Sequence, residues 1–220
     1  MRPTDLTSER VAVDGGTATP VRWRGETVLV RDDAGTALRC IAALQARDVD
    51  EGERRERVMT LLFVDWRDAW AACDYDAREL ARLVAEVAWD VLGVDIVGDR
   101  PHEEPLWDPA EDASLIRASL RMAYGIDWDA ERGEVSFAEF VALVAGCPTD
   151  TPIGRAIYYR DPRTRPKATR HNRRQVEEWQ RLHRAYALRG DGGATRAGRG
   201  SAGTNEAMDG AFAALSRRAR

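Results

Sequence analysis

The sequence predicts a mainly α-helical protein with a small N-terminal β-hairpin or sheet, followed by a bundle of about seven short helices. Short runs of β-branched residues separated by glycine turns occupy residues 8–31, which is typical of antiparallel strands. Beyond residue 35, apolar residues recur at helical spacing between capping motifs. Apolar residues make up 44% of the 220 positions, so the chain has enough apolar material for a packed core.

Composition divides the chain into three expected parts: a β element at residues 1–34, a helical domain at residues 35–188 and a tail at residues 189–220. Residues 189–204 are rich in glycine and arginine and contain no apolar side chain larger than alanine, which predicts a flexible linker. Residues 205–218 have the spacing of a short amphipathic helix. A helix of ~14 residues is marginal alone in water, so docking onto a partner and fraying are both open.

The β element is expected to contain three strands. The runs 11–13 and 21–23 lie on either side of an Asp-Gly-Gly turn at residues 14–16, and this arrangement predicts a hairpin. The run 27–30 predicts a third strand, which a turn at residues 24–26 precedes.

Three helices are expected in the next part of the chain. One short amphipathic helix includes residues 38–44, and a second ends at residues 58–63. The third is the clearest, because Asp76 and Glu79 form a capping box ahead of apolar residues at helical spacing. Gly93 then stands where a helix C-cap glycine is expected.

Four further helices complete the predicted bundle. The run 108–111, Asp-Pro-Ala-Glu, combines an N-cap acid with a proline in the first turn and predicts a helix start. Ser136 and Glu139 form another capping box, and the Thr-Pro pair at residues 151–152 opens the sixth helix. The seventh helix is expected at residues 172–188 with an apolar stripe along one face.

The sequence contains none of the common patterns for catalytic, cofactor or metal chemistry. Its three cysteines are widely spaced and form no CxxC pair, which predicts reduced, buried thiols and no zinc site: Cys40, Cys73 and Cys147. The stretch that begins at Asp127 resembles a calcium loop, but its positions 6 and 12 are Arg132 and Ala138, which predicts a solvated turn instead. We therefore expect no enzyme, no catalytic residue, no cofactor and no metal.

No apolar run approaches the ~20 residues that a membrane-spanning helix needs. The first ten residues also contain no apolar core of a secretory signal. We therefore expect neither an integral membrane protein nor an exported one, and we expect the cysteines to stay reduced in a cytoplasm.

Charge is distributed unevenly along the chain. Residues 1–154 contain 17 arginines and 31 acidic residues, a net charge of −14, whereas residues 155–220 contain 16 basic and 6 acidic residues, a net charge of +10. The densest basic segment is residues 155–174, with eight cations: Arg155, Arg160, Arg163, Arg165, Lys167, Arg170, Arg173 and Arg174.

This basic segment has two interpretations. Arginines can neutralise phosphates and the adjoining Tyr158 and Tyr159 can stack on bases, so a nucleic-acid-binding module that uses residues 155–174 is one alternative. The acidic remainder of the chain would repel a polyanion, however. The same arginines can instead contact the acidic part of a neighbouring copy, which favours protein contact and weak self-association.

Four stretches of the second half are similar to members of a small bacteriophage family. They are Tyr-Gly-Ile-Asp at 124–127, the aromatic helix at 137–143, Ile-Gly-Arg-Ala-Ile-Tyr-Tyr-Arg at 153–160 and the stretch at 182–188 that ends Tyr-Ala-Leu. The chain resembles the gp-fifteen type of siphophage proteins over about residues 10–188, and most specifically over residues 107–188. It departs from them where paired tryptophans are expected near Phe137 and in its Gly/Arg-rich tail.

The resemblance implies a tail assembly chaperone, a protein without catalytic activity that binds the tape-measure protein and keeps it soluble while the tail tube polymerises. It also implies the major tail tube protein as a second partner, a weak homo-oligomer, residence in the host bacterial cytoplasm and absence from the mature virion. Nine residues are predicted to contact a partner: Phe137, Phe140, Tyr158, Tyr159, Arg160, Arg163, Arg165, Trp179 and Tyr186.

Overall fold

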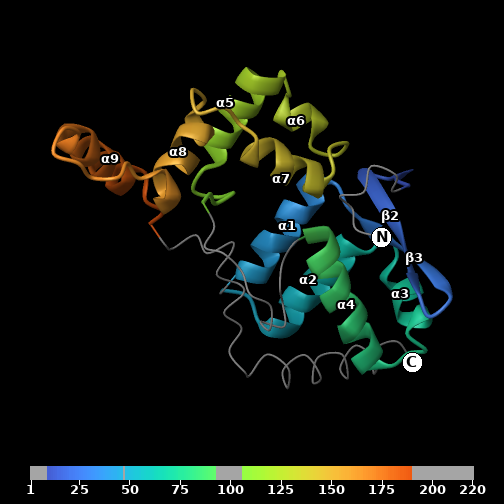
Figure 1. Ribbon diagram of the computed structural model, residues 1–220. Helices are drawn as coiled ribbons and strands as arrows, with labels where there is room; N and C mark the ends of the chain where they lie inside the picture. The colour runs from blue at the N-terminus through green and yellow to red at the C-terminus, as the bar shows by residue number, and fades with distance from the viewer. Residues whose placement is uncertain (1–8, 47, 93–105, 190–220) are drawn as a thin grey trace. The chain divides into compact units, whose positions relative to one another are not determined.

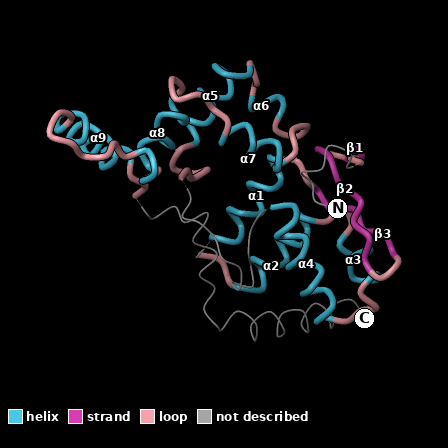
Figure 2. The backbone as a smooth tube through the Cα atoms, in the orientation of Figure 1, coloured by secondary structure: helices cyan, strands magenta, loops and turns pink. Residues whose placement is uncertain are grey.

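The computed structural model describes residues 9–46, 48–92 and 106–189 of the chain (Figure 1). Within these ranges the backbone forms a three-stranded antiparallel sheet, nine α-helices and one 3-10 helix. Helices account for most of the described backbone, as the cyan segments of Figure 2 show. The predicted fold class, mainly α with a small N-terminal sheet, is therefore confirmed.

The described chain divides into two compact units. The first unit contains the described residues before Gly93 together with residues 131–140, and the second contains residues 106–130 and 141–189. Residue 34, where the β element was expected to end, lies inside the first unit at the start of its first helix. Each unit has its own packing and is described separately below.

The sheet consists of β1 (Val11–Val13), β2 (Gly16–Trp23) and β3 (Glu26–Arg31), paired in sequence order. The three predicted strands are therefore confirmed, but the predicted hairpin pairing is wrong in register. β1 pairs with residues 16–18, and residues 21–23 pair with β3, because β2 begins directly after the turn at Asp14 and Gly15. Arg24 and Gly25 connect β2 to β3, and both have positive φ, 50° and 96°, as a two-residue type I′ turn requires. A turn of this type matches the right-handed twist of the strands that it joins.

Four helices follow in the first unit: α1 (Ala34–Gln45), α2 (Glu51–Leu62), α3 (Trp66–Ala72) and α4 (Ala77–Leu92). Each begins after an aspartate whose side chain accepts a hydrogen bond from a first-turn backbone N–H, namely Asp33, Asp50, Asp65 and Asp76. The sequence did not predict α3, because seven residues are too few to establish a helical period.

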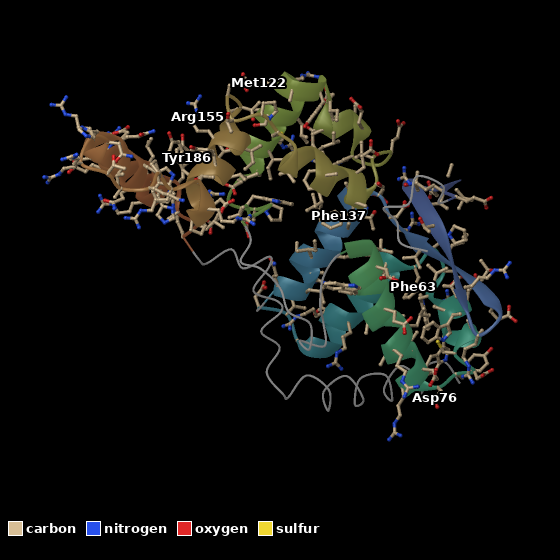
Figure 3. All side chains as sticks on the ribbon, viewed as in Figure 1. Phe63, Asp76, Met122, Phe137, Arg155 and Tyr186 are labelled. Atoms are coloured by element: carbon tan, nitrogen blue, oxygen red, sulfur yellow. The ribbon has the colours of Figure 1, made fainter. Side chains whose placement is uncertain are left out.

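The core of the first unit joins the sheet to these helices. β3 packs against α2 and α3, and α1 packs against α2 and α4. Val30, Phe63 and Leu83 are fully buried there, and burial stabilises such side chains by about 1.5–3 kcal/mol each (Phe63 is labelled in Figure 3). The N–H of Val64 donates to the carbonyl of Leu29 at 3.0 Å, so the chain that leaves α2 pairs with the edge of β3.

A segment from much later in the chain, residues 131–140, completes the first unit. The N–H of Ala34 donates to the carbonyl of Val135 at 2.8 Å, and the N–H of Phe137 donates to the carbonyl of Asp32 at 2.7 Å. These bonds attach the segment to the connection between β3 and α1. Long-range backbone pairing therefore closes this unit.

The later helices are α5 (Ala113–Tyr124), α6 (Trp128–Glu131), α7 (Phe137–Ala145), α8 (Pro152–Arg160), the 3-10 helix η1 (Pro162–Thr164) and α9 (Arg173–Tyr186). In the second unit α8 packs against α5, η1 and α9. The predicted N-caps at Ser136 and Thr151 are both confirmed by side-chain hydrogen bonds to the backbone. The stretch predicted as a solvated turn contains the single helical turn α6.

The predicted helix start at residues 108–111 is wrong, because α5 begins at Ala113. Asp108 does accept hydrogen bonds from two following backbone N–H groups, but its own N–H donates to the side chain of Asp112 at 2.9 Å. These bonds close a turn before the helix. The sequence therefore placed the capping aspartate correctly at Asp108, but the turn that this residue stabilises comes before the helix.

Some expectations lie outside the described residues. They concern the C-cap at Gly93 and residues 190–220 with the expected linker and terminal helix. Every helix in the described ranges is too short or too polar to cross a lipid bilayer.

Candidate functional site

The nine residues predicted to contact a partner differ in burial. Phe137 and Phe140 are buried in the first unit, where their rings stack with centroids 6.0 Å apart. Trp179 is buried in the second unit. The other six residues are partly or largely exposed and all belong to α8, η1, α9 and the loop between them. The structure therefore concentrates the accessible candidates in the second unit.

Three tyrosines from two helices form what we call the tyrosine cluster: Tyr158, Tyr159 and Tyr186 (Tyr186 is labelled in Figure 3). The rings of Tyr158 and Tyr159 meet edge to face with centroids 5.1 Å apart, and Tyr159 stacks almost parallel on Tyr186 at 5.8 Å. Tyr158 is 38% exposed and the other two are half-buried. Partly exposed tyrosines offer apolar ring surface together with a polar hydroxyl, a combination that is enriched in protein interfaces.

Arg160, the last residue of α8, holds three segments of the second unit together. Its guanidinium forms a bidentate ion pair with Asp112, with N–O distances of 2.6 and 2.9 Å. It also donates to the carbonyls of Tyr186 at 2.6 Å and Leu106 at 3.1 Å. The side chains of Arg160 and Asp112 are only 10% and 4% exposed. Arg160 therefore positions the tyrosine cluster by fixing the end of α9 against α8.

Side-chain contacts along α9 reinforce this attachment. The indole N–H of Trp179 donates to Thr164 Oγ1 at 3.1 Å, and its ring stacks on the imidazole of His183 at 4.8 Å. His183 Nδ1 lies 2.6 Å from the carbonyl oxygen of Tyr159, and it is the donor because a carbonyl only accepts. The hydrogen bond of His183 reaches the backbone of Tyr159, which belongs to the tyrosine cluster, so α9 holds the cluster as well as α8 does.

Residues 161–172, between α8 and α9, form what we call the basic loop. Asp161 accepts hydrogen bonds from the backbone N–H and the guanidinium of Arg163, at 2.8 and 2.9 Å. The guanidinium hydrogen bond, followed by the backbone one, lowers the pKa of the Asp161 carboxyl below its usual value. At the other end, Asn172 donates to the carbonyl of Lys167 at 2.8 Å. Hydrogen bonds at both ends therefore hold the basic loop in a defined conformation.

Most cations near the basic loop are available to a partner. Arg173 pairs with Glu177 at 2.8 Å in the first turn of α9. Five other cations of the basic segment are exposed and form no ion pair within the described ranges: Arg155, Arg165, Lys167, Arg170 and Arg174. Figure 3 shows nitrogen-tipped side chains around α9 and the loop before it. The second unit thus presents uncompensated positive charge beside the tyrosine cluster.

Sequence reasoning missed two exposed side chains on α5. Met122 is 65% exposed and is labelled in Figure 3, and Tyr124 is also exposed while its hydroxyl donates to the carbonyl of Leu143 at 3.1 Å. The signal was present, because Met122 lies off the buried stripe of Ile116 and Leu120. An apolar side chain on the polar face of an amphipathic helix is a candidate contact residue.

The described residues give little support for a metal site or a reactive thiol. In those ranges no group of three or more His, Cys, Asp or Glu side chains is arranged to hold a metal ion. Burial raises the pKa of the Cys40 thiol to about 12, so it is a weak nucleophile at neutral pH. The exposed side chains of the second unit are instead suited to aromatic packing and ion pairing with another macromolecule.

Comparison with known proteins gives one match. A family model described as Bacteriophage Gp15 protein matches residues 20–188. No curated protein and no solved structure matches the chain. The matched region takes in most of the sheet, all the described helices, the tyrosine cluster and the basic loop.

Proposed function

The chain belongs to the bacteriophage Gp15 protein family, and from this premise we propose that it is a tail assembly chaperone. It binds the tape-measure protein in the host bacterial cytoplasm and keeps it soluble until the tail tube forms, and it catalyses no reaction. The observation that carries this proposal is the family match, because it spans residues 20–188 and thus both described units. The resemblance to siphophage tail assembly chaperones supplies the role.

The physical need for such a protein follows from the tape measure itself. A very long, partly apolar helical chain exposes hydrophobic surface until the tube encloses it, and such surface causes aggregation. Small helical proteins that bind along an apolar stripe remove that surface from water. A chaperone of this kind needs a contact surface and requires no reacting group.

The tyrosine cluster is our candidate for that contact surface. Tyrosine supplies large contact area at a low entropic cost, since its side chain has only two χ angles. Arg160 and His183 already fix the backbone beside the cluster, so little further ordering is needed on binding. Met122 and Tyr124 add exposed apolar surface in the same unit.

A chaperone must also release its client. Interfaces that bury little surface are weak and transient. The few partly exposed side chains of the tyrosine cluster form an interface of this small size. Weak binding lets the major tail tube protein displace the chaperone as the tube grows. The tube protein is therefore the second partner in this proposal.

Co-expression with the tape-measure protein of the same phage or prophage genome tests the proposal. The tagged chain is pulled down and the complex is analysed by size-exclusion chromatography with light scattering. We expect the tape measure to be soluble and to co-elute with several copies of the chain. A tape measure that stays insoluble while the chain elutes alone would contradict the chaperone role.

A further inference from the structure

The basic loop and the first turn of α9 carry positive charge that the second unit leaves uncompensated. Four exposed cations here form no ion pair in the part of the chain that the structure describes: Arg165, Lys167, Arg170 and Arg174. They fall within ten residues of one another, so their like charges repel one another. An anionic surface brought from outside would lower this electrostatic free energy.

The start of α9 adds to the positive potential. Its first turn contains no acidic residue, and Asn172 makes no capping hydrogen bond because its amide is used inside the basic loop. Arg173 and Arg174 occupy the first turn, where the helix dipole is already positive. The basic loop and the helix dipole thus reinforce each other in favour of an anionic partner.

The first unit shows the opposite pattern at the end of α4. Glu86 and Asp90 are exposed on its last two turns and form no ion pair within the described ranges. The last turn contains no basic residue, although the C-terminal end of a helix is its negative pole. Within the residues that the structure describes, no cation therefore stabilises the acidic end of α4.

We propose that these two surfaces bind each other between copies of this chain, with the basic loop of one copy docked on the acidic end of α4 of the next. Charge complementarity identifies the occupant, since each surface lacks the charge that the other supplies. Nucleic acid is the poorer fit, because residues 1–154 carry a net charge of −14 and oppose the approach of a polyanion.

The geometry of such a contact has a consequence for assembly. Two different surfaces meet, so the interface is heterologous, and a heterologous contact that does not close into a ring continues as an open array. The inference goes beyond the proposed chaperone role by assigning a self-association surface. Its test uses the chain without any tape-measure protein, so either proposal can fail alone.

Charge reversal on each side provides the test. One variant carries Arg165→Glu and Arg170→Glu, a second carries Glu86→Arg and Asp90→Arg, and a control carries Arg155→Glu. Sedimentation velocity over a range of concentrations, at low and at physiological salt, measures self-association, and circular dichroism checks each fold. We expect the wild type and the control to associate in a salt-sensitive way, and each double variant to bind itself about tenfold more weakly or not at all.

The mixture of the two double variants gives the sharpest result. The first variant keeps the acidic end of α4 but has no net charge over the four cation positions of its basic loop, and the second has two basic surfaces. Neither binds itself, whereas a 1:1 mixture restores the pairing of a basic loop with an acidic α4 end and regains association. Two results overturn the inference: a wild type that stays monomeric at all concentrations, or double variants that associate as the wild type does. A wild type that stays monomeric but binds single-stranded DNA tightly would assign the basic loop to nucleic acid instead.

Discussion

Replacing Arg160 with methionine should destabilise the second unit strongly. Methionine preserves most of the aliphatic length but removes four N–H···O contacts, two of them to a carboxylate that is 4% exposed. In the part of the chain that the structure describes, the backbone N–H of Asp108 is then the remaining donor to Asp112, at 2.9 Å. Leaving one member of a buried pair without its partner costs about 3–5 kcal/mol, because the remaining charge stays desolvated.

Urea unfolding followed by circular dichroism measures this loss in the free energy of unfolding. The matched control is Arg155→Met, an exposed arginine on the same helix, which should change stability by no more than about 0.5 kcal/mol. Removing both charges with Arg160→Met and Asp112→Leu should recover about 2 kcal/mol of the single-variant loss. If Arg160→Met and Arg155→Met have equal midpoints, the positioning role assigned to Arg160 is wrong.

Three further predictions concern other parts of the chain. Gly154→Ala should destabilise by about 1–3 kcal/mol in the same urea assay, because its Cβ would lie 2.0 Å from the carbonyl oxygen of Pro148; an unchanged midpoint would count against that packing. Burial keeps the Cys40 thiol protonated in the folded state, whereas the thiol of the unfolded chain loses its proton near pH 9.0. The stabilisation that this difference contributes is therefore lost as pH rises from 9.0 to about 12, and Cys40→Ala should flatten that part of the plot of unfolding free energy against pH. Asp161 has a lowered pKa, so its contribution is present above the unfolded-state pKa and lost as pH falls through the folded one. Arg163→Ala should raise that pKa in an NMR titration, and an unmoved pKa would show that the guanidinium has no effect.

Local features of the fold could be predicted from the sequence because short-range hydrogen bonds encode them. The sequence pattern predicts N-caps at Ser136 and Thr151, and both are present in the structure. Each side chain accepts a hydrogen bond from a backbone N–H three residues later. The turn at Arg24 and Gly25 is equally local. Such features depend on a few neighbouring residues, and a single sequence displays those residues together.

Long-range features could not be predicted in this way. The ion pair between Arg160 and Asp112 joins residues 48 positions apart, and no periodicity or motif predicts it. The return of residues 131–140 to the first unit depends on backbone bonds to Asp32 and Ala34, which carry no side-chain signal.

The same limit applies to the candidate site. Tyr158 and Phe140 were both predicted to contact a partner, but Tyr158 is exposed and Phe140 is buried. Only packing separates the two, because burial depends on what covers each helix face. Met122 is a different case, because its position off the apolar stripe of Ile116 and Leu120 was visible in the sequence, and the structure shows it 65% exposed.

The most direct test of the central claim measures how much tape-measure protein stays soluble when it is co-expressed with variants of this chain. Tyr158→Ser removes the most exposed ring of the tyrosine cluster, and Tyr75→Ser removes a ring that is 67% exposed in the first unit. We predict that the wild type and the Tyr75 variant keep the tape measure soluble, whereas the Tyr158 variant leaves more of it in the pellet. Equal solubility with both variants would contradict binding through the tyrosine cluster, and an insoluble tape measure with the wild type would contradict the chaperone function itself.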